Sequence, residues 1–370
     1  MSGAFIPAAK PIFGEDEHRA VGRVLASNMV TQGPEVRAFE AEFARAMVKG
    51  RVCVAVNSGT SGLHLGLLAA GIGVGEEVIV PSFSFAATAN SVALTGAKPV
   101  FADIETDYFC LDPQSVLSAM TNRTKAIMPV HLYGHPANMP ALLAIARERG
   151  LSLFEDAAHA HGAALGDAKV GTFGAFGVFS LYATKNMTSG EGGMVSCGSP
   201  EIARRVRLLR NQGMTSCNAG EIVGVNNRMS DIHAAIGRVQ LTKVGAWTTK
   251  RQANAAFLTA HLQGVMVPRV APGAVHVYHQ YTIRIPGASN TERDRIVAVL
   301  RKQYGVGSGV YYRVPTHRLA SMARYGPGPE LPATERAAAE VISLPVHPSL
   351  DERDLERVVT AVNEVVKAGA

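Results

Sequence analysis

The fold class is decided by the segment Val52-Cys53-Val54-Ala55-Val56-Asn57-Ser58-Gly59-Thr60-Ser61-Gly62-Leu63-His64-Leu65. An apolar strand-like run is joined there to an apolar helical pattern by small polar residues. Six more strand-like runs follow, with helical patterns between them: residues 78–80, 99–104, 126–130, 151–155, 175–181 and 193–197. This alternation predicts an α/β fold whose sheet is parallel or mixed and is covered by helices.

The pattern changes in the last third of the chain. Helices are expected over residues 35–48 and 201–209 in the first part, and over 249–262, 291–304 and 351–367 in the second, which also has a strand-like run at 277–285. A length of 370 residues suits two domains. We therefore predict a large domain over residues 1–250 and a smaller C-terminal α+β domain over 251–370.

Composition excludes a disordered chain. Hydrophobic residues make up 47% and charged residues 18%, below the roughly 25% charge of typical soluble domains. The net charge of +6 suits phosphates, nucleotides or nucleic acid without choosing among them. Cys53, Cys110, Cys197 and Cys217 form no CxxC pair, so we expect reduced thiols and no metal site.

Two long stretches without a charged residue, 52–75 and 78–97, raise the question of a membrane span. Polar residues and Pro81 break both of them into strand-length and helix-length pieces, which favours buried α/β elements. The N-terminal segment lacks the apolar core of a secretory signal. A cytoplasmic protein without a membrane segment is the expectation.

Residues 57–65 are the first candidate for a functional site, because they lie between a strand and a helix. Small residues there let backbone N–H groups at a helix N-terminus approach an anion, and the helix dipole adds partial positive charge. The segment therefore suits a phosphate, although an ordinary capped turn would have the same composition.

Two further candidates are an acid and a base at strand ends. Asp156 follows an apolar strand, at the edge where α/β sheets place ligands, although a carboxylate there is also a common helix cap. Lys185 ends another apolar strand before a glycine-rich turn, which suits Schiff-base chemistry but also fits an exposed loop lysine. A pyridoxal phosphate enzyme requires all three features together: a phosphate cradle, a carboxylate for the ring nitrogen and a lysine for the aldehyde.

The chain resembles the DegT/DnrJ/EryC1/StrS family of sugar aminotransferases, within the fold-type I pyridoxal phosphate superfamily. The resemblance covers nearly the whole chain. It rests on Thr31-Gln32-Gly33-Pro34, residues 57–63, 75–90, 96–101 and 124–134, Glu155-Asp156-Ala157-Ala158, Thr184-Lys185-Asn186, Gly190-Glu191-Gly192-Gly193, Asn226 with Arg228-Met229-Ser230, and Ser343-Leu344-Pro345.

The resemblance implies a role for each matching residue. Lys185 forms the Schiff base with the cofactor and moves the proton, and Asp156 keeps the pyridine nitrogen protonated. Phe85 stacks on the ring. The expected phosphate ligands are Gly59, Thr60, Ser180 and, in the neighbouring subunit's site, Asn226. A homodimer with shared active sites follows.

Three departures from the family pattern concern the surroundings of the cofactor and the substrate. His159 stands where Gln is most common, and we keep it as a cofactor-site residue. Val225 and Asn227 replace frequent aromatics around Asn226. A Tyr311-Tyr312 pair replaces a common His-Tyr pair. Tyr311, His317 and Arg228 are the expected substrate contacts.

The expected activity is ping-pong transamination through pyridoxamine phosphate. L-Glutamate or L-glutamine supplies the nitrogen, and a keto-sugar, nucleotide-linked in our expectation, or a keto-cyclitol accepts it. Two alternatives are a sugar dehydratase of the same family, in which His typically replaces the lysine, and a non-catalytic regulatory protein with this fold. Neither nucleic acid nor a membrane is an expected partner.

Overall fold

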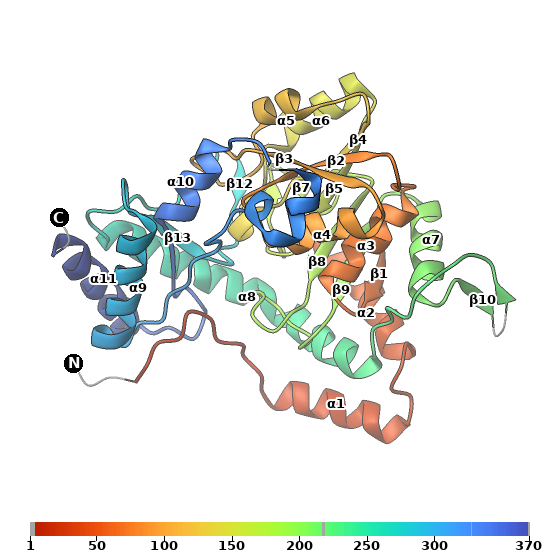
Figure 1. Cartoon of the computed structure of the whole chain (residues 1–370). Coiled ribbons are helices and arrows are strands. Elements are labelled where there is room, and N and C mark those ends of the chain that lie inside the picture. The colour runs from red at the N-terminus through yellow and green to blue at the C-terminus, as the bar shows by residue number, and fades with distance from the viewer. Residues whose placement is uncertain (1–3, 217–218, 327, 369–370) are drawn as a thin grey trace.

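The computed structural model describes residues 4–216, 219–326 and 328–368 (Figure 1). Its α-helices are α1 (Glu15–Ser27), α2 (Pro34–Met47), α3 (Gly59–Ala69), α4 (Ala87–Leu94), α5 (Pro113–Ala119), α6 (Met139–Arg149), α7 (Pro200–Arg210), α8 (Asp231–His261), α9 (Asn290–Tyr304), α10 (Pro332–Glu340) and α11 (Glu352–Lys367). Its strands are β1 (Val52–Val56), β2 (Glu77–Pro81), β3 (Lys98–Ala102), β4 (Thr124–Ile127), β5 (Ser152–Asp156), β6 (Ala164–Leu165), β7 (Ala168–Lys169), β8 (Phe176–Ser180), β9 (Gly193–Cys197), β10 (Met214–Ser216), β11 (Ala219–Gly220), β12 (Ala274–Val275), β13 (Tyr281–Arg284) and β14 (Val341–Leu344).

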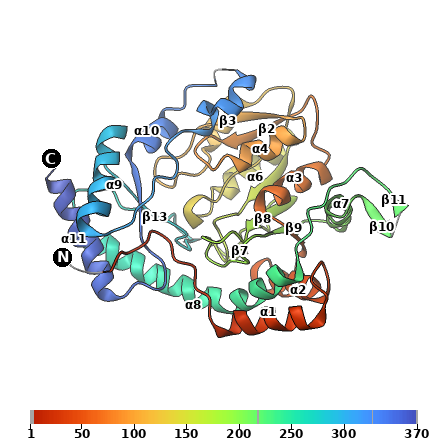
Figure 2. The same cartoon turned by 60° about the horizontal axis from the view of Figure 1, so that its bottom comes forward.

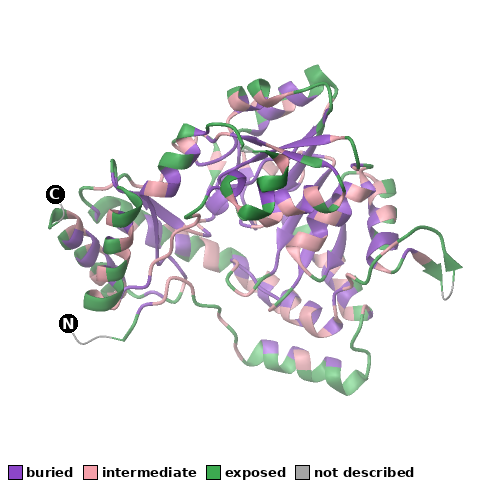
Figure 3. Ribbon diagram, in the orientation of Figure 1, coloured by how far each residue is buried: buried purple, intermediate pink, exposed green. Residues whose placement is uncertain are grey.

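A seven-stranded sheet forms the centre of the larger part, in the order β1-β9-β8-β5-β4-β2-β3. Neighbouring strands from β8 to β3 pair in parallel, and β9 pairs antiparallel with both β1 and β8. Every residue of β2, β8 and β9 is buried, as expected for strands covered on both faces (Figure 3). All seven strands coincide with strand-like runs of the sequence, which confirms the predicted α/β class.

Alternate residues of β1 show how the two faces are covered. Val54 and Val56 belong to the core that α3 and α7 complete, whereas Cys53 and Ala55 belong to the core that α2 completes. Successive side chains of a strand point to opposite faces, so α2 and α3 lie on opposite sides of the sheet. The described cysteines at 53, 110 and 197 are buried and free, and Cys217 lies outside the described residues.

The C-terminal part has its own apolar core, built by the antiparallel pair β13 and β14, the end of α8, and helices α9 and α11. Helix α8 runs from the large sheet to these helices (Figures 1 and 2). It begins at Asp231, well before the expected 249, because the Ser230 side chain accepts a hydrogen bond from the backbone N–H of His233 and caps it. The predicted domain change near residue 250 falls inside this continuous helix.

The strand expected over 277–285 begins only at Tyr281. Tyr278, with φ of 43°, has a left-handed backbone conformation that a strand does not accommodate. Residues 276–280 are therefore a loop, and this loop reaches the candidate site. Within the described residues, no helix is long and apolar enough to cross a membrane.

Candidate active site

A cavity of about 590 Å³ opens at the carboxyl ends of β2, β4, β5 and β8, which is where open α/β sheets bind ligands. Its lining comes from the strand ends, the N-terminus of α3 and two loops of the second half of the chain. The lining residues are Ser58, Gly59, Thr60, Leu63, Ser84, Phe85, Ala87, Val130, Asp156, Ala158, His159, Ser180, Tyr182, Thr184, Lys185, Glu191, His279, Gln280, Tyr311 and Tyr312.

The N-terminus of α3 forms one wall of the cavity. The Ser58 side chain caps this helix by accepting a hydrogen bond from the backbone N–H of Ser61. A Cβ atom on Gly59 would lie 3.0 Å from Cβ of Ser180, so only glycine leaves this corner open. The backbone N–H groups of Gly59 and Thr60, the helix dipole and the Ser180 hydroxyl therefore lie together, as a phosphate requires.

Lys185 extends into the cavity from the turn that follows β8, and its side chain is partly buried. Burial lowers the pKa of its ammonium group to about 8, although the negative charge of Asp156 opposes the shift. A lysine with this pKa is partly neutral near physiological pH. It is therefore competent both as a nucleophile toward an aldehyde and as a proton acceptor.

Asp156, the last residue of β5, is buried at the floor of the cavity. Its Oδ2 accepts a hydrogen bond from the Thr88 hydroxyl at 2.8 Å, and its Oδ1 accepts one from the backbone N–H of Ala158 at 3.1 Å. Burial raises the pKa of this carboxyl group, whereas the two hydrogen bonds and the charge of Lys185 favour the ionised form. The carboxylate retains lone pairs for a further donor in the cavity.

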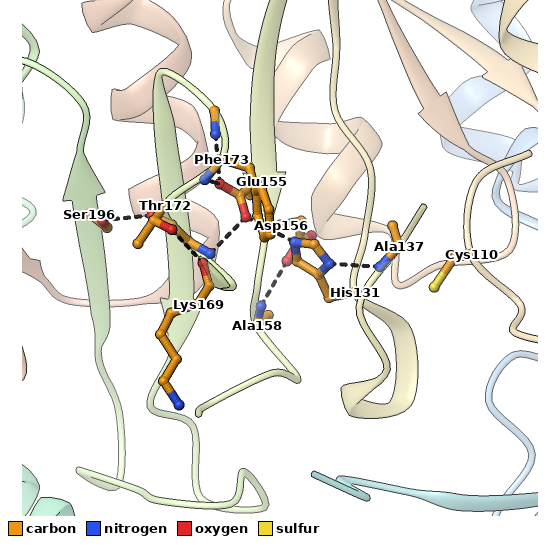
Figure 4. Close-up of polar contacts among 12 residues, drawn as sticks. Cys110, His131, Ala137, Glu155, Asp156, Ala158, Lys169, Thr172, Phe173 and Ser196 are labelled. Atoms are coloured by element: carbon orange, nitrogen blue, oxygen red, sulfur yellow. Dashed lines mark hydrogen bonds and ion pairs between the residues drawn. The ribbon is translucent and has the colours of Figure 1, made fainter. Parts of the chain in front are cut away.

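The residue before it, Glu155, is held by a separate buried network (Figure 4). Its Oε1 accepts hydrogen bonds from the N–H groups of Phe173 and Gly174, and its Oε2 accepts from Gly171 N–H and His131 Nε2. His131 Nδ1 accepts from Ala137 N–H, so the proton of its imidazole is on Nε2. This network fixes the end of β5 and thereby the position of Asp156.

His159 lies in the cavity wall and is buried. Its Nδ1 accepts a hydrogen bond from the backbone N–H of Tyr133 at 3.3 Å, and its ring centroid is 4.3 Å from that of His279. Burial lowers the pKa of both imidazoles well below the ordinary value, and the charge of Lys185 lowers each further. Both histidines are therefore neutral neighbours of the lysine.

The cavity brings together eight of the eleven residues that the sequence singled out: Gly59, Thr60, Phe85, Asp156, His159, Ser180, Lys185 and Tyr311. His317 lines a separate pocket of about 210 Å³, where its Nδ1 lies 2.5 Å from the Ser82 hydroxyl. Arg228 donates to the side chain of Asn211 at 2.9 Å, and Asn226 is exposed to solvent. These three residues do not line the cavity of their own chain.

Several lining residues had no assigned role in the sequence. His279 and Gln280 were hidden in a run interpreted as a strand. The left-handed backbone at Tyr278 is what separates these two residues from the strand that follows. The sequence does not indicate it, because tyrosine rarely adopts this conformation. Glu191 lies within a motif that carried the resemblance, and its position in the wall follows from the same turn that presents Lys185.

The sheet and the site define a class of protein, the pyridoxal-phosphate-dependent enzymes of the α/β type. Comparison with known sequences makes this specific: residues 11–363 match the model of the DegT/DnrJ/EryC1/StrS aminotransferase family. The chain belongs to this family, and pyridoxal phosphate is its cofactor. The predicted family, fold class and cofactor are confirmed.

Similarity to the relatives and to the solved structure described here extends over almost the entire chain. The chain is 41% identical to the dTDP-3-amino-3,4,6-trideoxy-alpha-D-glucose transaminase of Streptomyces venezuelae, covering 93% of this chain and 90% of the relative. It is 38% identical to a pleiotropic regulatory protein of Geobacillus stearothermophilus, with coverages of 94% and 93%. The crystal structure of S. venezuelae DesV with a ketimine intermediate superimposes with a TM-score of 0.88 at 40% identity, covering 95% and 94%.

The residues present fit this cofactor. The corner kept open by Gly59 beside Ser180 suits its phosphate, Asp156 retains lone pairs for the protonated ring nitrogen, and Lys185 suits its aldehyde. Phe85, a residue that is 59% exposed and lines the cavity, suits stacking on the cofactor ring.

Proposed function

We propose that the protein transfers an amino group from L-glutamate or L-glutamine to a keto-sugar, nucleotide-linked, or to a keto-cyclitol. The observation that carries the proposal is the shared cavity of Lys185 and Asp156, a base with a lowered pKa beside a buried carboxylate. Two relatives support a nucleotide-linked acceptor. One is the S. venezuelae transaminase described above, and the other is a UDP-N-acetyl-3-dehydro-alpha-D-glucosamine 3-aminotransferase of Acidithiobacillus ferrooxidans, 36% identical.

The protein groups divide the chemistry between them. Bound pyridoxal phosphate supplies an electron sink that stabilises negative charge on a substrate carbon. Asp156 provides a fixed negative charge for a cationic N–H donor at the floor of the cavity. Lys185, with a pKa of about 8, would act as a general base and then as a general acid, moving the proton between the substrate carbon and the cofactor carbon. The helix N-terminus at Gly59 and the Ser180 hydroxyl would hold the phosphate group.

The cofactor test comes first. Purified protein supplied with pyridoxal phosphate should absorb in the visible range, and borohydride should fix the cofactor on Lys185, as mass spectrometry of the peptide would show. Lys185→Ala should abolish both signals. A protein that develops no such band after addition of the cofactor is not the proposed enzyme.

The acceptor test uses a panel of substrates. The names of both relatives place the amino group at carbon 3 of the sugar. Nucleotide-linked 3-keto sugars are therefore the first substrates to test, with 4-keto sugars and keto-cyclitols as comparisons. Glutamate-dependent formation of an amino sugar with an equal amount of 2-oxoglutarate supports transamination. A dehydratase would consume the sugar without that stoichiometry.

The name of the G. stearothermophilus relative favours one second candidate, a regulatory protein with this fold. Against it, a chain without catalysis has no physical need for a buried carboxylate beside a partly buried lysine, because both are costly to desolvate. Retention of the cofactor together with failure on every acceptor of the panel would favour the regulatory role.

We also propose a cytoplasmic homodimer with shared active sites. Asn226 is exposed and outside its own cavity, and the same surface loop presents apolar side chains, with Val223 93% exposed and Val225 40% exposed. Exposed apolar side chains of this kind suit burial against a second copy. Sedimentation velocity would test the dimer, and a monomer at assay concentrations would contradict it.

A further inference from the structure

Asn186, the residue after Lys185, ties the lysine turn to the distant loop 276–280. Its side chain is buried, and its Nδ2 donates a hydrogen bond to the carbonyl oxygen of Val277 at 3.0 Å. Its Oδ1 lies 3.3 Å from Nδ1 of His279. Because Nδ2 is the donor to Val277, Oδ1 can only accept, so His279 carries its proton on Nδ1.

The loop 276–280 is itself anchored to the other side of the cavity. Val277 N–H donates to the carbonyl of Gly134 at 3.1 Å, and Gln280 N–H donates to that of Tyr133 at 3.2 Å. The N–H of Tyr133 in turn donates to His159, three residues beyond Asp156. A continuous series of hydrogen bonds therefore connects the turn that carries Lys185 with the strand end that carries Asp156.

The backbone along this series is strained. Tyr133 has φ of 58° and Tyr278 has φ of 43°, a left-handed conformation that costs non-glycine residues on the order of 1–3 kcal/mol each. Such residues persist only where the surrounding contacts determine their conformation. Strain of this kind gathers at sites that must hold a fixed geometry.

We propose that His279 is a positioning residue for Lys185: through its Nδ1–H it orients Asn186 and so holds the lysine turn at a fixed distance from Asp156. The inference rests on the proposed role of Lys185. His279 acts as a neutral donor, since burial lowers its pKa well below the ordinary value and a second cation beside Lys185 is disfavoured. The cofactor chemistry described above assigns no role to His279.

The test compares variants that keep or remove the Nδ1 donor. His279→Asn places an amide N–H where Nδ1 stands, whereas His279→Gln and Asn186→Leu remove the contact. We expect His279→Gln and Asn186→Leu to slow the single-turnover reaction with L-glutamate by roughly 10- to 100-fold, as a displaced reacting group does. KM for glutamate should change little, and His279→Asn should recover most of the rate. His347→Asn, which removes a buried imidazole bonded to Pro7, is the matched control.

A second measurement does not depend on catalysis. Amide hydrogen exchange of the cofactor-free protein should be at least about tenfold faster over residues 181–192 in His279→Gln and Asn186→Leu, and unchanged there in His279→Asn and His347→Asn. Equal impairment of His279→Asn and His279→Gln would overturn the proposal, as would normal rate and protection in His279→Gln. If the wild type reacts with neither L-glutamate nor L-glutamine, the transamination proposal fails, while the exchange result still tests the hydrogen bonds.

Discussion

Lys185 should destabilise the protein that it makes active. The pKa of its ammonium group falls from an ordinary 10.5 to about 8 in the folded chain, a difference worth roughly 3 kcal/mol at 1.36 kcal/mol for each tenfold change. The side chain is only partly buried, so water recovers part of this cost. We therefore expect Lys185→Met to raise the free energy of unfolding of the cofactor-free protein by about 1–3 kcal/mol at pH 7.

The pH dependence fixes the sign of this effect. Between pH 8 and 10.5 the unfolded lysine binds a proton that the folded lysine has lost, so the wild type gains stability as pH rises through this window. The penalty is complete below pH 8 and absent above 10.5. The advantage of Lys185→Met should therefore be constant from pH 6 to 7.5 and shrink toward zero near pH 10.5.

Urea unfolding at one fixed protein concentration measures the effect, since a dimer would make stability depend on concentration. Lys250→Met, on an exposed position of α8, is the control and should shift stability by less than about 0.5 kcal/mol. A variant no more stable than the wild type at pH 7 would refute the reasoning. So would an advantage that persists undiminished at pH 10.5.

Three further predictions concern the site. Asp156→Asn removes a carboxylate from the floor of the cavity and should slow amino transfer by on the order of 100-fold or more, while borohydride still traps the cofactor. An unchanged kcat would contradict the proposed role of Asp156. Gly193→Ala would place a Cβ 2.5 Å from the carbonyl oxygen of Ser58, so it should lower the free energy of unfolding in urea by about 1–3 kcal/mol and weaken cofactor binding measured by fluorescence. Unaltered cofactor affinity would show that the backbone at Ser58 moves to accommodate the added methyl group. Mixed and refolded Lys185→Ala and Asn226→Ala chains should recover about a quarter of wild-type activity, because half the dimers are mixed and each has one intact site; no recovery would contradict shared sites.

The elements of the large sheet could be predicted because their causes are local. The run 52–56 and the other buried strands are continuous apolar segments bounded by turns, and such runs have few alternatives in an α/β chain. The start of α8 could not be predicted from apolar periodicity. It depends on the Ser230 cap, and the helix carries apolar residues on several sides because it contacts both α2 and the C-terminal core.

The residues of the candidate site likewise include some that could be predicted from local sequence and some that could not. Gly59, Asp156 and Lys185 were predictable because the carboxyl ends of strands meet at one edge of a sheet, whatever the details of packing. His279 and its contact with Asn186 were not, because 93 residues separate them and the contact depends on a left-handed tyrosine between two short elements. His317 is close in sequence to Tyr311, which lines the cavity, and was expected to contact the substrate as well. In the structure it lines a separate pocket.

Glu155 and Asp156 show how hydrogen bonding separates a structural acid from a functional one. Both are buried carboxylates at the end of β5, and in the sequence it was the family resemblance that assigned the role to Asp156. Neighbouring strand residues face opposite sides, and Glu155 faces a loop that supplies three N–H groups, with His131 as a fourth donor. Its oxygens are saturated, so it can stabilise the loop but can bind little else.

Asp156 faces the cavity with two described donors, one hydroxyl and one N–H. A buried carboxylate left with free lone pairs is costly, and the cost is tolerable where a cationic ligand satisfies them on binding. Folding energy thus holds Asp156 incompletely bonded beside Lys185, and cofactor binding should restore part of the stability that both residues cost the empty protein. The same contrast between saturated and unsaturated buried acids would identify the functional carboxylate in related chains whose motifs have diverged.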